Sequence, residues 1–247
     1  EDHDYIHANW VDGYREPKKY IITQAPLPHT TSQFWKMLWQ EKCLVVVSMI
    51  QMFDVTGAEV NMLSCKKSGY SNRDINLIHC GTRCVRETYD VIHKGEERLL
   101  LHLCYFSWGY RGTPKKPTEV LNFITDINYN RELLIKQAVG DKFYSSPIVI
   151  HCLAGTARSA MVTALDICLR KLDDTARRKC GPFVDVEDVV LRLRTQRAMK
   201  PEQYLFIHLA VFEYAVRQGY IPDEIYKEID LEGFFYEKKQ REESQKK

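Results

Sequence analysis

The chain has 247 residues, of which 45% are hydrophobic and 28% are charged, a composition typical of a soluble globular protein with a sizeable core. Its formal net charge of +2 is too small to indicate nucleic acid or an acidic membrane surface as a partner. No apolar run reaches the roughly 18–20 residues that a membrane span needs.

Strands and helices are predicted to alternate through the first half of the chain. Residues 18–28, KKYIITQAPLP, predict a strand that ends in a proline-bounded loop. A threonine or serine is expected to cap a helix over 30–42, where apolar side chains recur at helical spacing. The β-branched run at 43–50 predicts a strand buried on both faces. Alternating polarity between 59 and 104 predicts antiparallel strands and hairpins, most clearly at 98–106.

The second half continues the pattern, with one buried strand at 146–152 and four helices. The helices are predicted at 117–134, 159–172, 184–197 and 202–218. This interleaving predicts an α/β protein, a single domain over residues 1–236 with a central mixed sheet flanked by helices. Residues 237–247 form a charged tail, expected to be a frayed helix or disordered.

The segment 149–160, VIHCLAGTARSA, joins a predicted strand to a predicted helix through small residues. A helix N-terminus carries unpaired backbone N–H groups and roughly half a positive charge, and a glycine-containing loop before it turns further N–H groups inward. Gly155 is the loop residue best able to take a positive φ. The pattern predicts a phosphate cradle made by Cys152, Leu153, Ala154, Gly155, Thr156, Ala157 and Arg158.

Cys152 is the candidate nucleophile at the mouth of this cradle. Inward N–H groups, the helix dipole and Arg158 favour its thiolate, which beneath a bound phosphate is placed to attack phosphorus. The Ser159 hydroxyl is a candidate hydrogen-bond donor to the sulfur. From these residues alone, the alternative is a core cysteine and small residues that merely join strand to helix. His151 by itself is expected to be a hydrogen-bonded core histidine rather than a base.

The eight cysteines are widely spread, which favours reduced thiols in the cytoplasm over a disulfide scaffold. The one compact group, His79 and Cys80 with Cys84, lacks a fourth ligand at a matching spacing. Buried or edge-strand cysteines are therefore favoured over a zinc site, and we expect no metal and no organic cofactor.

Several motifs resemble, in order, those of the cysteine-dependent protein tyrosine phosphatases. HCLAGTAR followed by SA is similar to the family's signature loop, which is a histidine, a cysteine, five residues and an arginine. Further family-like stretches are DYIHANWVDGY, YIITQAPLPHTTSQFWKMLW, VVVSMI and RTQR with EQYLFIH. The resemblance covers nearly the whole chain. It implies the family's highly twisted mixed sheet, with Cys152 as nucleophile and Arg158 as the phosphate-binding arginine.

The resemblance also implies a general acid, an aspartate in a tryptophan–proline–aspartate loop, and FSWGYRGTP departs from that pattern. Trp108 matches the hinge tryptophan, and Gly112 and Pro114 match the end of the loop. Gly109 stands where the family has proline, and Tyr110 where it has the aspartate. A phenol, with a pKa of about 10, gives almost no driving force for protonating another phenolate. Without the proline, loop closure should also be less sharply defined.

A second departure concerns hydrolysis of the cysteinyl phosphate, for which the family positions water with two glutamines. RTQRAMKPEQYLF is about three residues short. Gln203 matches the later glutamine, whereas the earlier one has no counterpart near Lys200 and Pro201. Glu59 resembles the family's glutamate that supports the signature arginine. The alternative, that Glu59 is an ordinary solvated glutamate, is equally favoured. The family's phosphotyrosine-recognition loop is expected upstream of residue 1.

We therefore predict a pseudophosphatase that binds a tyrosine-phosphorylated partner, for example a kinase, and sequesters or scaffolds it with little or no turnover. Two alternatives stay open. One is a slow but active phosphatase, acting on substrates with better leaving groups or with a carboxylate such as Glu59 as acid. The other is a purely structural interaction domain whose pocket binds nothing.

Overall fold

The structure, a computed structural model, describes residues 5–50, 71–79, 84–108, 113–114, 116–138, 143–197, 199, 201–222 and 224–225. For 71–79, 84–90 and 201–202 it describes the backbone alone. Several sequence predictions fall outside the described residues: Glu59, Cys80, Gly109, Tyr110, Gly112, Lys200 and the tail 237–247.

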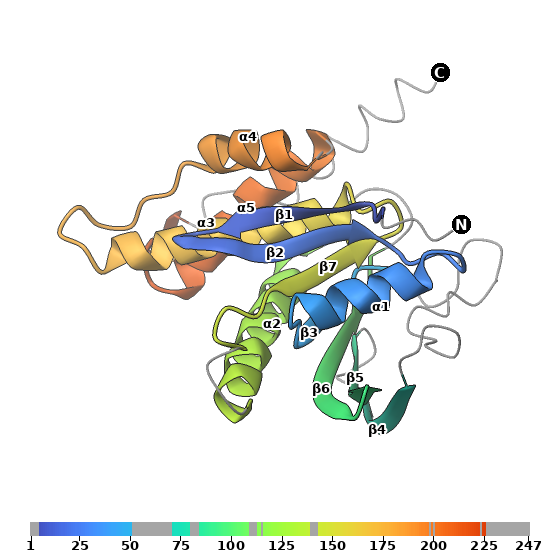
Figure 1. Cartoon of the computed structure of the whole chain (residues 1–247). Helices are drawn as coiled ribbons and strands as arrows, with labels where there is room; N and C mark the ends of the chain where they lie inside the picture. Colours follow the sequence, from blue (N-terminus) through green and yellow to red (C-terminus); the bar gives the residue numbers. More distant parts are fainter. Residues whose placement is uncertain are drawn as a thin grey trace, which may run out of the picture.

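A seven-stranded mixed sheet lies at the centre of the molecule (Figure 1). Its strands are β1 Ala8–Gly13, β2 Glu16–Gln24, β3 Val45–Ser48, β4 Ser71–His79, β5 Cys84–His93, β6 Glu96–Tyr105 and β7 Ile148–Cys152. They are ordered β1-β2-β7-β3-β6-β5-β4. The four central strands β2, β7, β3 and β6 run parallel, and β1, β5 and β4 pair antiparallel to their neighbours.

Helices cover both faces of this sheet (Figure 1). Helix α1, Thr31–Gln40, packs over one face with Phe34, Trp35 and Leu38. The other face carries α2 Pro117–Gln137, α3 Arg158–Ala176, α4 Val186–Gln196 and α5 Pro201–Arg217. Together these layers make the predicted α/β architecture.

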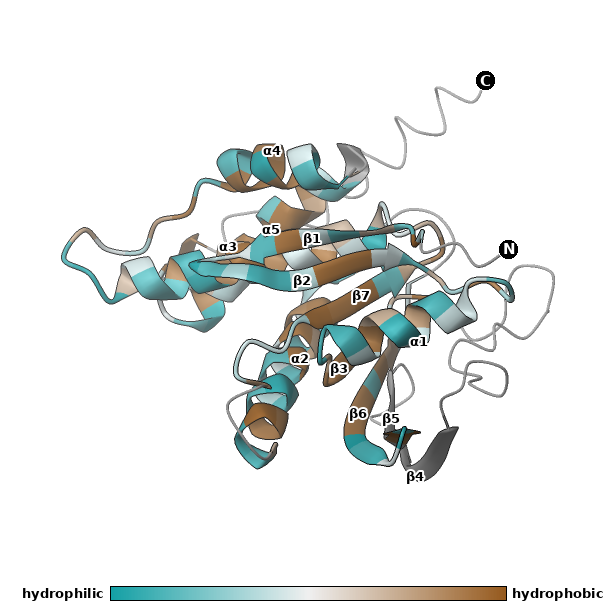
Figure 2. Ribbon diagram, in the orientation of Figure 1, coloured by the Kyte–Doolittle hydropathy of each residue, from teal (hydrophilic) through white to brown (hydrophobic). Residues whose placement is uncertain are grey.

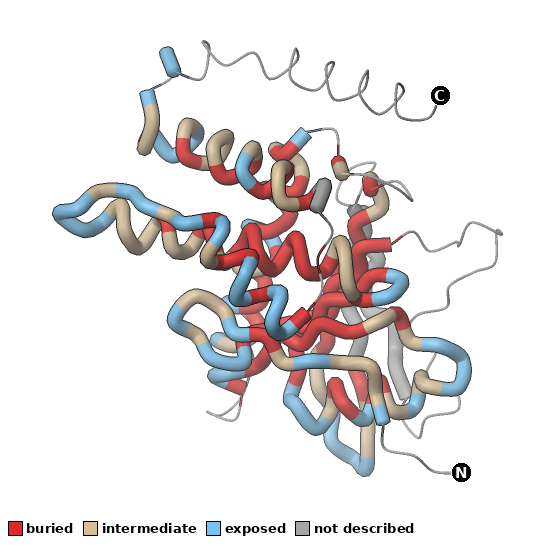
Figure 3. Tube along the Cα trace, turned by 90° about the horizontal axis from the view of Figure 1, so that it is seen from above, coloured by how far each residue is buried: buried red, intermediate tan, exposed pale blue. Residues whose placement is uncertain are grey.

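The central strands are apolar because both of their faces are buried. Val45, Val46 and Val47 in β3 are fully buried, and β7 is buried along its whole length. Figure 2 shows the hydrophobic colour along β7, and Figure 3 shows buried residues through the middle of the molecule. The continuous apolar runs at 43–50 and 146–152 thus predicted fully buried strands correctly.

Two local predictions differ from the structure. Strand β1 was not predicted, because the short segment ANWVDG has no sustained apolar alternation and buries only Val11 at the sheet edge. Helix α1 begins without a side-chain cap: the N-cap Thr30 makes no cap hydrogen bond, and its hydroxyl instead accepts from the Leu27 N–H at 2.9 Å. The threonine therefore closes the preceding turn rather than the helix.

The cysteines whose side chains are described carry free thiols, with Cys43, Cys104, Cys152 and Cys168 buried and Cys180 exposed. Within the described parts of the chain, histidine, cysteine and acidic side chains form no group of three or more that could hold a metal ion. Among the described helices, none is long and apolar enough to cross a bilayer.

Candidate functional site

The candidate site lies where the central parallel strands end. Cys152 is the last residue of β7, and it pairs in register with Gln24 at the end of β2. On the other side of β7, His151 pairs with Ser48, the last residue of β3. Carboxyl ends of parallel strands form the usual ligand-binding edge of α/β sheets. The topology therefore places Cys152 at that edge.

The loop after Cys152 folds tightly back onto β2. The Ala25 N–H donates to the Cys152 and Leu153 carbonyls at 2.9 and 3.1 Å. Gly155 has φ +68°, and a Cβ there would lie 2.6 Å from the Gln24 nitrogen and closer still to the Thr23 carbonyl. Only glycine fits this position, because both the backbone conformation and the contact with β2 exclude a side chain.

Helix α3 starts directly behind the loop, with Ala157 as its N-cap and Arg158 as its first residue. The Ala157 side chain cannot accept a hydrogen bond, so it leaves the first backbone N–H groups of α3 uncapped. These groups and the helix dipole favour an anion at the loop. Leu153 is 56% exposed and Gly155 is buried, so the loop has an open mouth and a closed floor.

Ser159 contacts the candidate nucleophile. Its Oγ lies 3.4 Å from the Cys152 Sγ, and both residues are buried. A hydroxyl that donates to sulfur stabilises the thiolate and later the departing thiolate of a covalent intermediate. The structure thus brings together the cysteine and serine that the sequence pattern singled out.

Arg158 lies between the end of β3 and the tryptophan of the loop after β6. Its Nη1 donates to the Met49 carbonyl at 2.9 Å, and its guanidinium carbon lies 5.9 Å from the centroid of the Trp108 ring. Trp108 is almost fully buried, so it forms a fixed wall beside the arginine. Gly109 and Tyr110, which follow it, lie outside the described residues.

Arg197, at the end of α4, is a site residue that the sequence interpretation missed. Its Nε donates to the Gly155 carbonyl at 2.6 Å, and its Nη1 donates to the Asn9 Oδ1 at 2.5 Å. Burial lowers the pKa of Arg197, while the nearby Cys152 raises it. The guanidinium braces the floor of the loop and ties it to β1. One arginine at a helix end gives no sequence signal of such a contact, because its partners lie 42 and 188 positions away.

His151 faces the opposite side of the sheet from Cys152. It is fully buried in a T-shaped contact with Phe34, with ring centroids 6.1 Å apart. We expected a hydrogen-bonded core histidine; the structure buries the ring, but neither ring nitrogen has a hydrogen-bond partner among the described residues. Burial, with a smaller contribution from His102, lowers the pKa of His151 to about 3. The ring is thus a neutral core group.

Gln203 lies in the first turn of α5 and is buried. Helix α5 packs on α3 (Figure 1). Cys152 belongs to the same core cluster as residues of both helices, so α5 brings Gln203 to the Cys152 side of the sheet. The five positions between Arg197 and Gln203 span the place where the sequence is short of a second glutamine. The site therefore combines a thiol, a hydroxyl, a helix N-terminus and the Arg158 guanidinium, which suit a phosphate dianion, while Arg197 braces the loop from below.

Comparison with known proteins agrees with this geometry. The family profile described as "Protein-tyrosine phosphatase" matches residues 1–213. Tyrosine-protein phosphatase non-receptor type 9 from Mus musculus is 32% identical over 242 residues, covering 89% of this chain and 38% of the relative. Tyrosine-protein phosphatase Lar-like from Caenorhabditis elegans is 33% identical over 229 residues, covering 87% of this chain and 10% of the relative. The chain thus spans well under half the length of these relatives.

Solved structures match over most of the fold. The catalytic domain of human protein tyrosine phosphatase non-receptor type 18 has a TM-score of 0.70 and 27% identity, covering 86% of this chain and 75% of the other. PTPN18 in complex with HER2 phosphopeptides gives a TM-score of 0.70 at 25% identity, covering 86% and 72%. Fold and site together fit a protein with a candidate phosphate-binding loop that begins at a cysteine. The chain belongs to the protein-tyrosine phosphatase family.

Proposed function

We propose that this chain is a pseudophosphatase domain, which binds phosphotyrosine in a partner protein and releases little or no phosphate. The observation that carries the proposal is the combination of FSWGYRGTP with an intact phosphate cradle. Tyr110 occupies the general-acid position, between Trp108 and Pro114, which both match the family's loop. The binding groups Cys152 and Arg158 are retained.

The chemistry of the leaving group explains why a tyrosine at position 110 should prevent turnover. Phosphotyrosine releases a phenolate, whose conjugate acid has a pKa of about 10, and a general acid contributes about 10²–10⁴-fold to such steps. Binding of the ground-state dianion needs only the N–H groups and guanidinium groups of the cradle. Removal of the acid therefore separates binding from turnover.

The contacts around the cradle support retained binding. Arg197 holds the Gly155 carbonyl, and Ser159 lies against the Cys152 sulfur. PTPN18, a structural relative, is known in complex with HER2 phosphopeptides. We infer a partner of the same chemical class for this chain: a tyrosine-phosphorylated protein, such as a kinase, which it would sequester or scaffold in the cytoplasm.

A slow phosphatase is the second candidate, because the relatives named above are tyrosine phosphatases and Cys152 keeps its serine neighbour. In that case a carboxylate elsewhere, with Glu59 as candidate, would supply the proton. This candidate predicts slow but measurable turnover by the unmodified chain, whereas the pseudophosphatase predicts that turnover needs a restored acid.

The test is hydrolysis of phenyl phosphate by the wild-type chain and by a Tyr110→Asp variant, with Tyr110→Phe as the matched control. We expect Tyr110→Asp to raise kcat by about 10²-fold or more, and Tyr110→Phe to leave it unchanged. The gain should shrink with p-nitrophenyl phosphate, whose better leaving group needs less protonation. A wild-type rate that already equals that of Tyr110→Asp would rule out the proposal and favour the slow phosphatase.

A further inference from the structure

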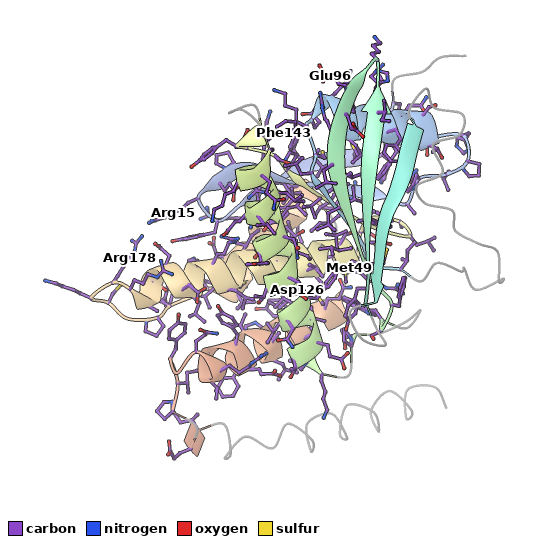
Figure 4. All side chains as sticks on the ribbon, turned by 90° about the horizontal axis from the view of Figure 1, so that it is seen from below. Arg15, Met49, Glu96, Asp126, Phe143 and Arg178 are labelled. Atoms are coloured by element: carbon purple, nitrogen blue, oxygen red, sulfur yellow. The ribbon has the colours of Figure 1, made fainter. Side chains whose placement is uncertain are left out.

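A cavity of about 440 Å³ lies at the opposite end of the parallel strands from the cradle. Figure 4 shows Glu96 and Phe143 at this end and Met49, beside the cradle, at the other. The cavity is lined by Leu44, Glu96, Glu97, Arg98, Leu99, Leu134, Gln137, Ala138 and Phe143. Because strand residues rise about 3.3 Å each, the two ends of β6 are roughly 30 Å apart. The cavity is thus a separate site.

The floor of the cavity is apolar and its rim is acidic. Leu44, Leu134 and Phe143 supply much of the floor, while the carboxylates of Glu96 and Glu97 stand on the exposed first residues of β6. A volume within the range of roughly 300–1,000 Å³ is typical of a ligand-binding site, and the lining here mixes apolar side chains with Glu96, Glu97, Arg98 and Gln137. The floor can contact apolar groups of a ligand, and the carboxylates of the rim favour a positive charge beside those groups.

The positive charge of Arg98 does not neutralise this whole rim. Its Nη1 donates to the Trp39 carbonyl at 2.8 Å, and its Nη2 forms an ion pair with Glu96 at 3.0 Å. The guanidinium carbon also lies 3.7 Å from the Trp39 ring centroid, so the arginine is fixed against α1. Glu97 has no ion-pair partner among the described residues. Among the described lining residues, the two glutamates therefore outnumber the one arginine.

We propose that this cavity docks a short peptide segment of a partner protein, which inserts an apolar side chain onto the floor and places a lysine or arginine against Glu97. Tyr144, which follows the floor residue Phe143, is 82% exposed and extends the surface beside the opening. Exposed aromatic side chains of this kind are frequent anchors in protein interfaces. Acidic and phosphorylated segments are disfavoured here by the rim, so this occupant differs from the ligand of the cradle.

The test is selection of random dodecapeptides, displayed on phage, against the full chain, followed by fluorescence anisotropy with the enriched peptides. We expect enriched peptides to carry an apolar residue within three positions of a lysine or arginine. Their affinity should fall at least 10-fold for Ala138→Trp, which fills the cavity, and for Glu97→Lys, which reverses the rim charge. Tyr129→Trp introduces a tryptophan, and Glu224→Lys reverses a charge, at exposed positions outside the cavity, and both should leave the affinity unchanged.

Three outcomes would overturn this proposal: no enriched peptides, enriched peptides that are acidic, or peptides that bind both cavity variants as tightly as wild type. Melting temperatures identify a variant that fails to fold, and Glu97→Gln then provides a milder change, with an expected loss of a few-fold. Arg158→Met should not alter the affinity of these peptides. Failure of the docking site is therefore distinguishable from failure of the phosphotyrosine site.

Discussion

Gly155 is the residue on which the shape of the cradle depends most directly. Its φ of +68° and its contact with the β2 backbone leave no room for a Cβ. Gly95, in the turn between β5 and β6, has a similar φ of +81° but nothing within 4 Å of the same position. A comparison of these two glycines therefore separates the free-energy cost of a left-handed backbone conformation from the cost of a collision with β2.

Gly155→Ala is therefore expected to destabilise the chain more than Gly95→Ala. A left-handed alanine costs roughly 1–2 kcal/mol at either position, and the collision with β2 should raise the cost at Gly155 to about 3 kcal/mol or more. Urea denaturation of both variants measures the difference. Equal losses would mean that the loop moves away from β2 at no cost.

His151 should make stability depend on pH. With its folded pKa lowered to about 3, the buried ring stays neutral while the unfolded imidazole takes up a proton below about pH 6.5. The stability present above pH 6.5 is therefore lost as the pH falls toward 3, at about 1.4 kcal/mol per pH unit. Urea denaturation between pH 7 and 4.5 should show that His151→Leu removes this part of the slope. His208→Gln, at an exposed position, should not.

At the scale of elements, a buried polar network joins β2 to α2 and α3. Lys19 and Tyr20 of β2 both donate to the Asp166 Oδ2 in α3, and Asn128 of α2 donates to the other carboxylate oxygen at 2.6 Å. Burial opposes ionisation of Asp166, but Lys19 and Arg170 outweigh it and hold the pKa of Asp166 below its ordinary value. Burial lowers the pKa of Lys19. The network fixes how the two helices sit on the sheet.

Asp166→Asn is expected to cost about 3–5 kcal/mol, because it leaves the Lys19 ammonium buried without its counter-ion. Lys19→Met should offset part of that loss, so the double variant should be more stable than the sum of the single changes implies. Because the folded pKa of Asp166 is depressed, its contribution is present at neutral pH and is lost in acid. Additive losses at pH 7 in a double-mutant cycle would contradict this account.

The elements show where sequence patterns suffice. The buried strands β3 and β7 and the amphipathic helix α2 were predicted, because burial on two faces or on one helical face leaves a period in the sequence. Strand β1 lacks such a period, because it lies at the sheet edge and buries a single side chain, so it requires no regular apolar pattern. The contact of Arg197 with Gly155 joins distant positions, and no local pattern reports it. Of the site, the loop from Cys152 to Arg158 was predicted, and its bracing was not.

At the scale of the whole molecule, the cradle is built from segments that only the fold brings together. Gln24, Ser48 and Cys152 meet because β2, β3 and β7 are parallel neighbours, and α4 delivers Arg197 from beyond them. A bound dianion would contact this assembled edge and would favour the folded chain over the unfolded one. A ligand at 100 times its Kd stabilises a protein by about 2.7 kcal/mol. A rise in the free energy of unfolding on addition of the ligand would therefore report binding at this site.

The most direct test follows phosphotyrosine peptide binding and phosphate release in the same sample. Calorimetric titration of the wild-type chain should give saturable binding, and a phosphate assay should detect no release over hours. Arg158→Met should weaken binding at least 10-fold, and Arg194→Met, an exposed arginine in α4, should not. Steady release of phosphate by the wild-type chain, or the absence of binding that depends on Arg158, would contradict the claim that this cradle holds phosphotyrosine without turning it over.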